Sequence, residues 1–99
     1  MWRMARKHDD VQRLVPALRQ ADSEAFGILV KTLSAALYRY AYSIVGESNT
    51  AQDVVQESFL SIYRSRTKLD LNGSLRTFCF HVATRRALDA LRSSTNIAK

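Results

Sequence analysis

Apolar residues recur every three or four positions along nearly the whole chain, and this spacing limits the possible folds more than any other feature. An α-helix turns once every 3.6 residues, so such a spacing places the apolar side chains along one face. We find no stretch in which apolar and polar residues alternate between hairpin turns, as they do in a half-buried strand. The sequence therefore predicts an all-α fold, a compact bundle of about four helices.

The first two helices are expected within residues 11–20 and at about 22–45. The apolar stripe of the first consists of Val11, Leu14, Val15 and Leu18. Pro16 falls inside this stripe, and because proline is tolerated only in the first turn, this helix starts late or is kinked. The second helix is long, since it is bounded by Asp22, a typical N-cap residue, and by Gly46, which can adopt the left-handed conformation that ends helices.

A third helix is expected to begin at Thr50, because Thr50-Ala-Gln-Asp53 has the form of a capping box. Its inward residues are Ala51, Val54, Val55, Phe59 and Ile62. Its outer side carries Asp53, Gln56, Glu57 and Leu60. Such a polar face is either simply solvated or, as the leucine among charged side chains favours, a surface that binds a partner.

A fourth helix is expected from the Ser74 cap to about Arg92, after a polar connection at 65–73. Its predicted buried stripe consists of Leu75, Phe78, Cys79, Val82, Ala83, Ala87, Ala90 and Leu91. The opposite side carries Arg76, His81, Arg85 and Arg92, with Arg86 near the boundary. Asp89 is spaced to pair with the nearby arginines, and the tail 94–99 lacks periodicity, as a linker does.

Positive charge is concentrated in the last third of the chain. The net charge is +6, and residues 64–99 carry eight basic and two acidic side chains, whereas the charges of residues 1–63 cancel. This asymmetry indicates a polyanionic partner, either a nucleic acid or an anionic membrane surface.

Several classes of protein are excluded by composition. One cysteine and two histidines make neither an internal disulfide nor a zinc cluster, and three scattered glycines form no phosphate-binding loop. We therefore expect no catalytic residues, no metal, no cofactor and no small-molecule substrate. Cys79 is expected to be a small buried residue rather than a redox switch. No apolar run is long enough for direct membrane insertion or a signal peptide, so the cytoplasm is the expected location.

Four motifs, in the right order, resemble region 2 of bacterial sigma factors, most closely those of the extracytoplasmic-function (ECF) group. They are Asp22-Ser-Glu-Ala-Phe26, Ala51-Gln-Asp-Val-Val-Gln-Glu-Ser-Phe-Leu60, Gly73-Ser-Leu-Arg-Thr-Phe78 and Ala87-Leu-Asp-Ala-Leu-Arg92. The resemblance implies a transcription factor, not an enzyme. Such a factor binds core RNA polymerase, recognises the minus-ten element, and holds the non-template strand open with one base flipped out.

The resemblance also implies roles for individual residues. Asp53, Gln56 and Glu57 match the family's D-x-x-Q-E set, which docks on the clamp helices of the largest polymerase subunit, and Leu60 lies on the same face. The 65–73 loop corresponds to the segment that holds the flipped base, where Lys68, Asp70 and Asn72 are expected to bond the base edge. The implied promoter contacts on the fourth helix are Arg76, Arg85, Arg86 and Arg92 as phosphate or base ligands, and Phe80 and His81 as stacking groups.

Two positions depart from the family pattern. The family commonly has Trp at the position of Phe78, which is expected in the core here. It often has Asn at the position of Arg85, and because arginine prefers phosphate or guanine acceptors, promoter preference is expected to differ.

The resemblance divides the chain into an N-terminal segment with the first helix at 1–20, the region 2 domain at 21–93 and the start of a linker at 94–99. The domain that binds the minus-thirty-five element in complete ECF factors is expected to be absent, so the chain is either a fragment or a stand-alone domain. The resemblance also implies an anti-sigma factor as a further partner. It further implies that the chain itself acts in a stress response.

Two other hypotheses remain open. One is a sigma-like decoy that binds an anti-sigma factor without binding DNA, although such a decoy is expected to lose the basic helix. The other is a basic amphipathic module for an anionic membrane, which requires an exposed apolar face beside the arginines.

Overall fold

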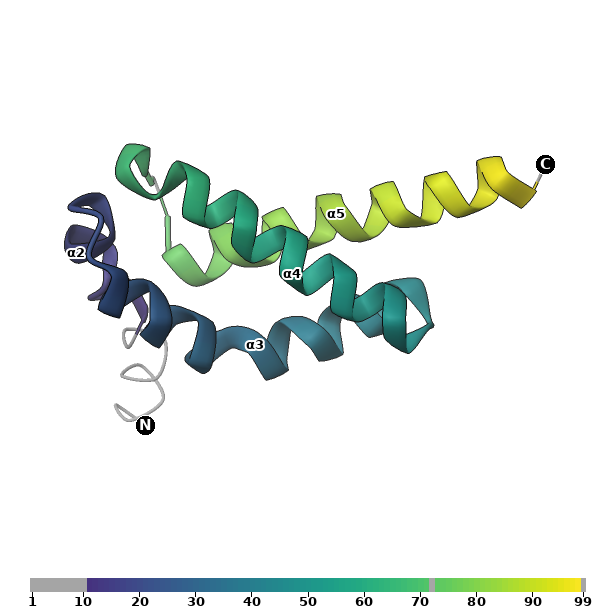
Figure 1. Cartoon of the computed structure of the whole chain (residues 1–99), viewed down its shortest axis with the longest axis horizontal. Helices are drawn as coiled ribbons and strands as arrows, with labels where there is room; N and C mark the ends of the chain where they lie inside the picture. Colours follow the sequence, from purple (N-terminus) through teal and green to yellow (C-terminus); the bar gives the residue numbers. More distant parts are fainter. Residues whose placement is uncertain (1–10, 72, 99) are drawn as a thin grey trace.

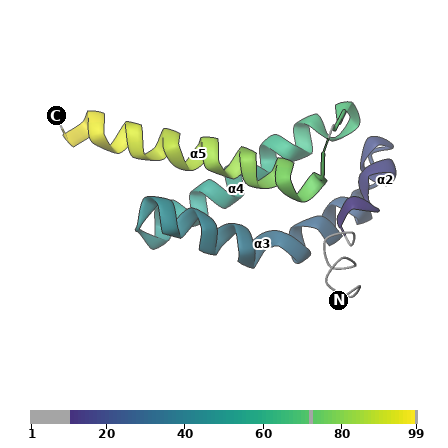
Figure 2. The same cartoon turned by 180° about the vertical axis from the view of Figure 1, so that it is seen from behind.

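All regular secondary structure in residues 11–71 and 73–98, the part of the chain that the computed structural model describes, is helical. The elements are α2 (Val15–Arg19), α3 (Ser23–Val45), α4 (Ser48–Ser65), the 3-10 turn η1 (Arg66–Lys68) and α5 (Leu75–Ala98). α3 and α4 form an antiparallel hairpin, and α5 packs across both of them (Figures 1 and 2). The expected all-α bundle with one long helix at about 22–45 is confirmed.

The first segment is helical at residues 11–12 and again from Val15, with a turn at 13–14 between, so the helix is interrupted just before Pro16, in keeping with the expected late start or kink. The proline lies in the first turn of the helix, where its missing N–H leaves no hydrogen bond unmade. All four residues of the predicted apolar stripe in this segment are buried. They pack α2 against η1 and the start of α3, at the end of the bundle where the 66–74 connection lies.

The predicted limits of α3 are confirmed at both ends. The Asp22 carboxylate accepts hydrogen bonds from the backbone N–H groups of Glu24 (2.9 Å) and Ala25 (3.4 Å). At the other end Gly46 has φ 73°, and its N–H donates to the Tyr42 carbonyl at 2.8 Å. This left-handed conformation favours glycine, because a Cβ atom would be strained there.

The predicted capping box at Thr50 is wrong. α4 begins two residues earlier, and its N-cap is Glu47, whose carboxylate accepts from the N–H groups of Asn49 (3.1 Å) and Thr50 (2.8 Å). The Thr50 hydroxyl also donates to this carboxylate, at 2.5 Å. These bonds, with that of the Thr50 hydroxyl foremost, lower the pKa of Glu47 below its ordinary value of 4.5. Because Glu47 caps the helix, Asp53 lies well inside it and its side chain is exposed on the outer face.

The core lies where the three long helices meet, and α2 closes one end of it. Cys79 belongs to this core and is fully buried, as expected. Burial raises the pKa of its thiol to about 12, and the nearby positive charge of Arg76 opposes this shift only in part. The thiol therefore stays protonated at neutral pH and contributes as a small apolar group.

The end of α5 differs from the expectation in two respects. The helix continues to Ala98 instead of ending near Arg92. Extending a helix that already exists adds a hydrogen bond for each residue fixed, so weak periodicity does not stop it. Leu91, predicted to be buried, is 39% exposed, because α4 begins beside Ala90 and α5 runs on past the end of the hairpin (Figure 1).

Candidate functional site

The 66–74 connection and the first turns of α5 enclose a hollow of about 470 Å³, which we call the loop hollow. It is lined by Ser65, Lys68, Leu69, Asp70, Leu71, Gly73, Ser74, Thr77, Phe78 and His81. Three of the predicted DNA-binding residues, Lys68, Asp70 and His81, thus come together here. Asn72, predicted for the same role, lies outside the described residues.

Ser74 fixes the start of α5 beside the loop hollow. Its hydroxyl accepts from the Thr77 N–H at 3.0 Å and bonds the Thr77 hydroxyl at 2.8 Å, which confirms the predicted cap. Positions three to four residues apart share a helix face, so Thr77, Phe78 and His81 point to the same side as the cap. The loop hollow therefore combines hydroxyl groups, a cation, a carboxylate and an aromatic ring.

Phe78 and Phe80 lie on different sides of α5. Phe78, which the sequence assigns to the core, is half-buried and lines the loop hollow. Phe80, which the resemblance offers for base stacking, packs instead against the ring of Tyr40, at 5.2 Å between centroids. The Arg76 guanidinium lies 5.3 Å from the Phe80 ring centroid, so this pair also points away from the loop hollow. Ser74, Phe78 and His81 are spaced three or four residues apart and so share one helix face, whereas Phe80 does not fit this spacing. This is the sequence signal that separates the Phe78 ring from the Phe80 ring.

The remaining arginines of α5 have three different environments. Arg85 is exposed, whereas Arg86 is half-buried in a cleft between α4 and α5 of about 290 Å³, the interhelical cleft. That cleft is lined by Thr50, Asp53, Val54, Glu57, Arg86, Asp89 and Ala90. Arg92 is exposed and donates to Asp89 at 2.5 Å, the one ion pair among the described residues. Such a surface pair contributes little energy, so Arg92 stays available to an anion.

The residues predicted for the outer face of α4 lie on two sides of the helix, one toward α5 and one toward α3. Its four residues, Asp53, Gln56, Glu57 and Leu60, are all exposed. The two carboxylates line the interhelical cleft on the α5 side. Gln56 and Leu60 line a separate groove on the α3 side.

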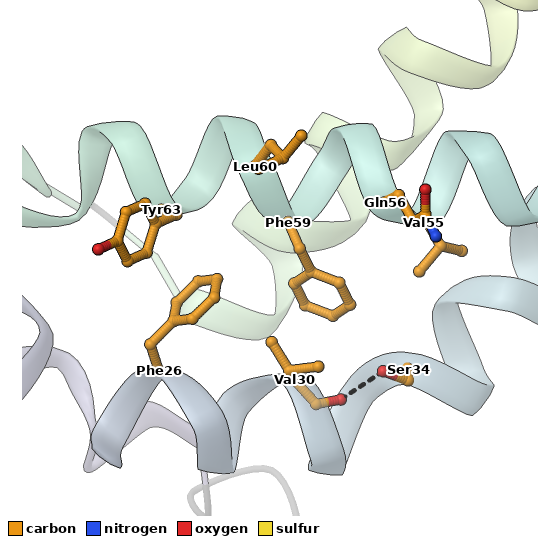
Figure 3. Close-up of a pocket in the computed structure, with 8 residues that line it drawn as sticks. All are labelled: Phe26, Val30, Ser34, Val55, Gln56, Phe59, Leu60 and Tyr63. Carbon is orange, nitrogen blue, oxygen red and sulfur yellow. Dashed lines mark hydrogen bonds between the residues drawn. The ribbon is translucent and has the colours of Figure 1, made fainter. Parts of the chain in front are cut away.

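The groove on the α3 side is apolar, has a volume of about 620 Å³ and lies between α3 and α4 (Figure 3). It is lined by Phe26, Val30, Ser34, Val55, Gln56, Phe59, Leu60 and Tyr63. Sequence reasoning missed its α3 side and Tyr63. The available signal was Tyr63, one turn beyond Leu60 on the same exposed face.

The aromatic rings give the groove a fixed shape. The Phe26 ring packs edge-on against Phe59 (6.3 Å between centroids) and against Tyr63 (5.0 Å). The Arg66 guanidinium covers the Tyr63 ring at 3.7 Å and donates to the Tyr63 carbonyl at 2.6 Å. Leu60 remains 47% exposed and Tyr63 39% exposed, so the groove presents apolar surface to solvent at its rim. A surface of this kind suits an apolar side chain of a protein partner.

Two other kinds of site are absent from the described part of the chain. No group of three histidine, cysteine, aspartate or glutamate side chains is placed to hold a metal ion. None of the described helices combines the length and the apolar character needed to cross a membrane.

Comparison with known proteins agrees with this arrangement. The family described as Sigma-70 region 2 matches residues 29–97, and the chain belongs to this family. The ECF RNA polymerase sigma factor SigW of Bacillus subtilis (strain 168) is a homologue, 24% identical over 82 residues. The match covers 83% of this chain and 44% of SigW, so the chain spans less than half the length of that relative.

A solved structure is also similar. It is the NMR structure of an engineered region 2 of sigmaE in complex with GTAAAA, which matches with a TM-score of 0.77 and 28% identity. The match covers 86% of this chain and 88% of that one. The expected identity as an ECF-type region 2 domain is therefore confirmed.

Proposed function

We propose that this chain binds the non-template strand of the promoter minus-ten element and core RNA polymerase, and that it keeps the strand open during transcription initiation. The observation that carries the proposal is the loop hollow, which has base-sized room next to the basic surface of α5. The similarity to a sigmaE domain in complex with GTAAAA supports it. The role is regulatory rather than enzymatic, and it belongs in the bacterial cytoplasm, where polymerase acts.

The chemistry of the loop hollow suits an unstacked base. Lys68 and the Thr77 hydroxyl offer donors, the Asp70 carboxylate offers acceptors, and the Phe78 ring offers an apolar wall. Flipping a base out of the stack costs a few kcal/mol, and hydrogen bonds to its edge with contacts to a ring recover that energy. Arg85 and Arg92 are exposed farther along α5 and would neutralise phosphates of the same strand. These exposed arginines favour DNA binding over the decoy alternative.

Polymerase docking is assigned to α4 and the apolar groove. Asp53 and Glu57 can accept charge-assisted hydrogen bonds from arginines of the clamp helices. Gln56 and Leu60 border the groove, whose apolar walls would take a bulky side chain of the same partner. The two depressions on either side of α4 would then be parts of one docking surface.

Binding of the strand is tested by fluorescence anisotropy with single-stranded GTAAAA and with versions in which each base in turn is replaced by an abasic site. We expect at least one abasic replacement to weaken binding strongly, since the loop hollow would be empty. With three to five phosphates neutralised, the slope of log affinity against log salt should be about −2 to −3.5. An affinity that changes neither with abasic replacement nor with salt concentration would contradict the proposed binding of the minus-ten strand.

Docking is tested by a pull-down of a fragment that contains the polymerase clamp helices. The double variant Asp53→Ala with Gln56→Ala should lose binding while its helicity is unchanged. Gln52→Ala removes a neighbouring exposed side chain of α4 and serves as the matched control. Equal binding by all three chains would exclude this face of α4.

An anti-sigma factor is a further proposed partner. A protein that covers Gln56 and Leu60 would occupy the surface assigned to polymerase and so would inhibit without any chemistry. If so, a bound anti-sigma factor and the clamp-helix fragment should compete in the same pull-down. Simultaneous binding of both would argue against a shared surface.

A further inference from the structure

The N-terminal helical segment, residues 11–21, is hydrogen-bonded to both ends of the segment that forms the loop hollow. The Nε–H of Arg19 donates to the Leu69 carbonyl at 2.8 Å. The side-chain oxygen of Gln12 accepts from the backbone N–H of Leu75 at 2.7 Å. Leu69 stands between Lys68 and Asp70, and Leu75 follows Ser74, so each bond fixes backbone next to residues that line the loop hollow.

Few other bonds hold this segment. Among the residues that the structure describes, Asp70, Leu71 and Gly73 take part in no hydrogen bond, and the Leu69 carbonyl accepts only from Arg19. The N–H of Leu75 belongs to the first turn of α5, whose amides have no partner within the helix. Gln12 supplies that partner from a segment 63 positions away in the sequence.

Apolar packing supports the same connection. Leu14 and Leu18 of the N-terminal segment share one buried cluster with Leu69 and Leu75. Residues 11–21 lie outside the range 29–97 that matches the sigma-70 region 2 family. This support of the loop hollow is therefore supplied by a part of the chain that the family match does not include.

We propose that Arg19 and Gln12 are positioning residues for base binding: they set the backbone of the 69–75 segment and so the shape of the loop hollow. The inference rests on the proposed function of the loop hollow. Neither residue is assigned a contact with DNA. Their effect should therefore appear in the recognition of the base and not in the contacts made with phosphates.

The variants are chosen to separate position from charge. Arg19→Met removes the donor and keeps much of the side-chain length. Arg13→Met removes the same charge from an exposed residue of the same segment, one that bonds to no other described side chain or loop backbone. Gln12→Met removes the acceptor, whereas Gln12→Glu keeps it.

Binding is measured with GTAAAA and with the abasic strand that the wild-type chain binds least well. We expect Arg19→Met and Gln12→Met to weaken binding of the intact strand by about 2- to 10-fold, the effect of one lost hydrogen bond. Binding of the abasic strand by these two variants should change no more than in Arg13→Met. Equal losses on both strands, or equal behaviour of Arg19→Met and Arg13→Met, would overturn the proposal.

Amide hydrogen exchange provides a measurement that needs no DNA. The Leu75 amide should exchange faster in Gln12→Met than in the wild type and Gln12→Glu, while amides in the middle of α3 stay protected. Unchanged protection of Leu75 in Gln12→Met would overturn the proposal as well. If the wild-type chain itself does not distinguish intact from abasic strands, the proposed function fails, whatever the exchange data show.

Discussion

The hydroxyl of Tyr40 on α3 lies 2.7 Å from the hydroxyl of Thr84 on α5. The Thr84 hydroxyl donates its proton to the Phe80 carbonyl at 2.8 Å, so Tyr40 must be the donor in the bond between the two side chains. The Tyr40 ring also packs edge-on against Phe80. These contacts hold Phe80 against α3, whereas Phe78 and His81 line the loop hollow on another side of α5.

Removing the Tyr40 hydroxyl should destabilise the fold slightly. Tyr40→Phe deletes the donor and leaves Thr84 still bonded to Phe80, so we expect a loss of about 1 kcal/mol in the free energy of unfolding. Urea denaturation measures this value. Tyr42→Phe is the control, since Tyr42 is 46% exposed and its hydroxyl bonds to no described residue. A larger effect in the control would contradict the role given to Tyr40.

Arg85 and Arg86 are adjacent in sequence but should contribute unequally to DNA binding. Arg85 is exposed, whereas Arg86 shares the interhelical cleft with Asp53, Glu57 and Asp89. If Arg85 neutralises one phosphate, Arg85→Gln should weaken binding of GTAAAA and make the salt slope shallower by about 0.7. Arg86→Gln should change both quantities less, because that side chain is half-buried in the interhelical cleft. The opposite order would mean that Arg86 leaves the cleft to reach the strand.

Glu47 should make the stability of α4 depend on acidic pH. Its folded-state pKa is lowered, so its contribution is present above the ordinary value of 4.5 and is lost as the pH falls through the lowered value. Glu47→Gln should therefore lower the melting temperature at pH 7 and approach the wild type as the pH falls below the lowered pKa of Glu47. Glu57→Gln removes another exposed carboxylate of α4 that bonds to no described residue, and it controls for net charge. If the melting temperatures of Glu47→Gln and the wild type differ by the same amount at every pH, the Glu47 carboxylate does not stabilise α4 as its cap.

Cys79 should be unreactive in the folded chain. Burial keeps the thiol protonated, with a pKa of about 12, and the thiolate is the form that reacts. A thiol reagent at pH 8 should label it slowly in buffer and rapidly in denaturant. Because the unfolded thiol ionises near 9.0 and the folded thiol does not, stability should decline as the pH rises above 9.0. Cys79→Ala should lack that component, and rapid labelling of the native chain would contradict the buried position.

Adjacent residues of α4 should separate folding from docking. Phe59 is 7% exposed and packs in the core, so Phe59→Ala should lower the free energy of unfolding by about 3–5 kcal/mol. Leu60 is 47% exposed, so Leu60→Ala should leave stability within about 0.5 kcal/mol while weakening the clamp-helix pull-down. Thermal and denaturant unfolding test the first statement. Retention of full binding by Leu60→Ala would remove this residue from the docking surface.

The sequence alone determined the features that depend on neighbours along the chain. Asp22, Gly46 and Ser74 were recognised as caps because a cap bonds amides or carbonyls only a few residues away. Helix faces followed from the 3.6-residue period, and the ordered motifs indicated the ECF region 2 family. Glu47 was missed because glutamate is an uncommon N-cap, and Thr50 offered the more usual pattern.

Only the tertiary structure decided which helix faces meet. Periodicity shows that Phe78 and Phe80 lie on different sides of α5, but only the packing of α5 against the other helices decides which ring lines the loop hollow and which meets Tyr40. Phe26 and Tyr63 form one groove because α3 and α4 fold back on each other. The bonds from Gln12 and Arg19 span 63 and 50 positions. Such contacts depend on how the helices cross, and no local pattern of residues encodes that arrangement.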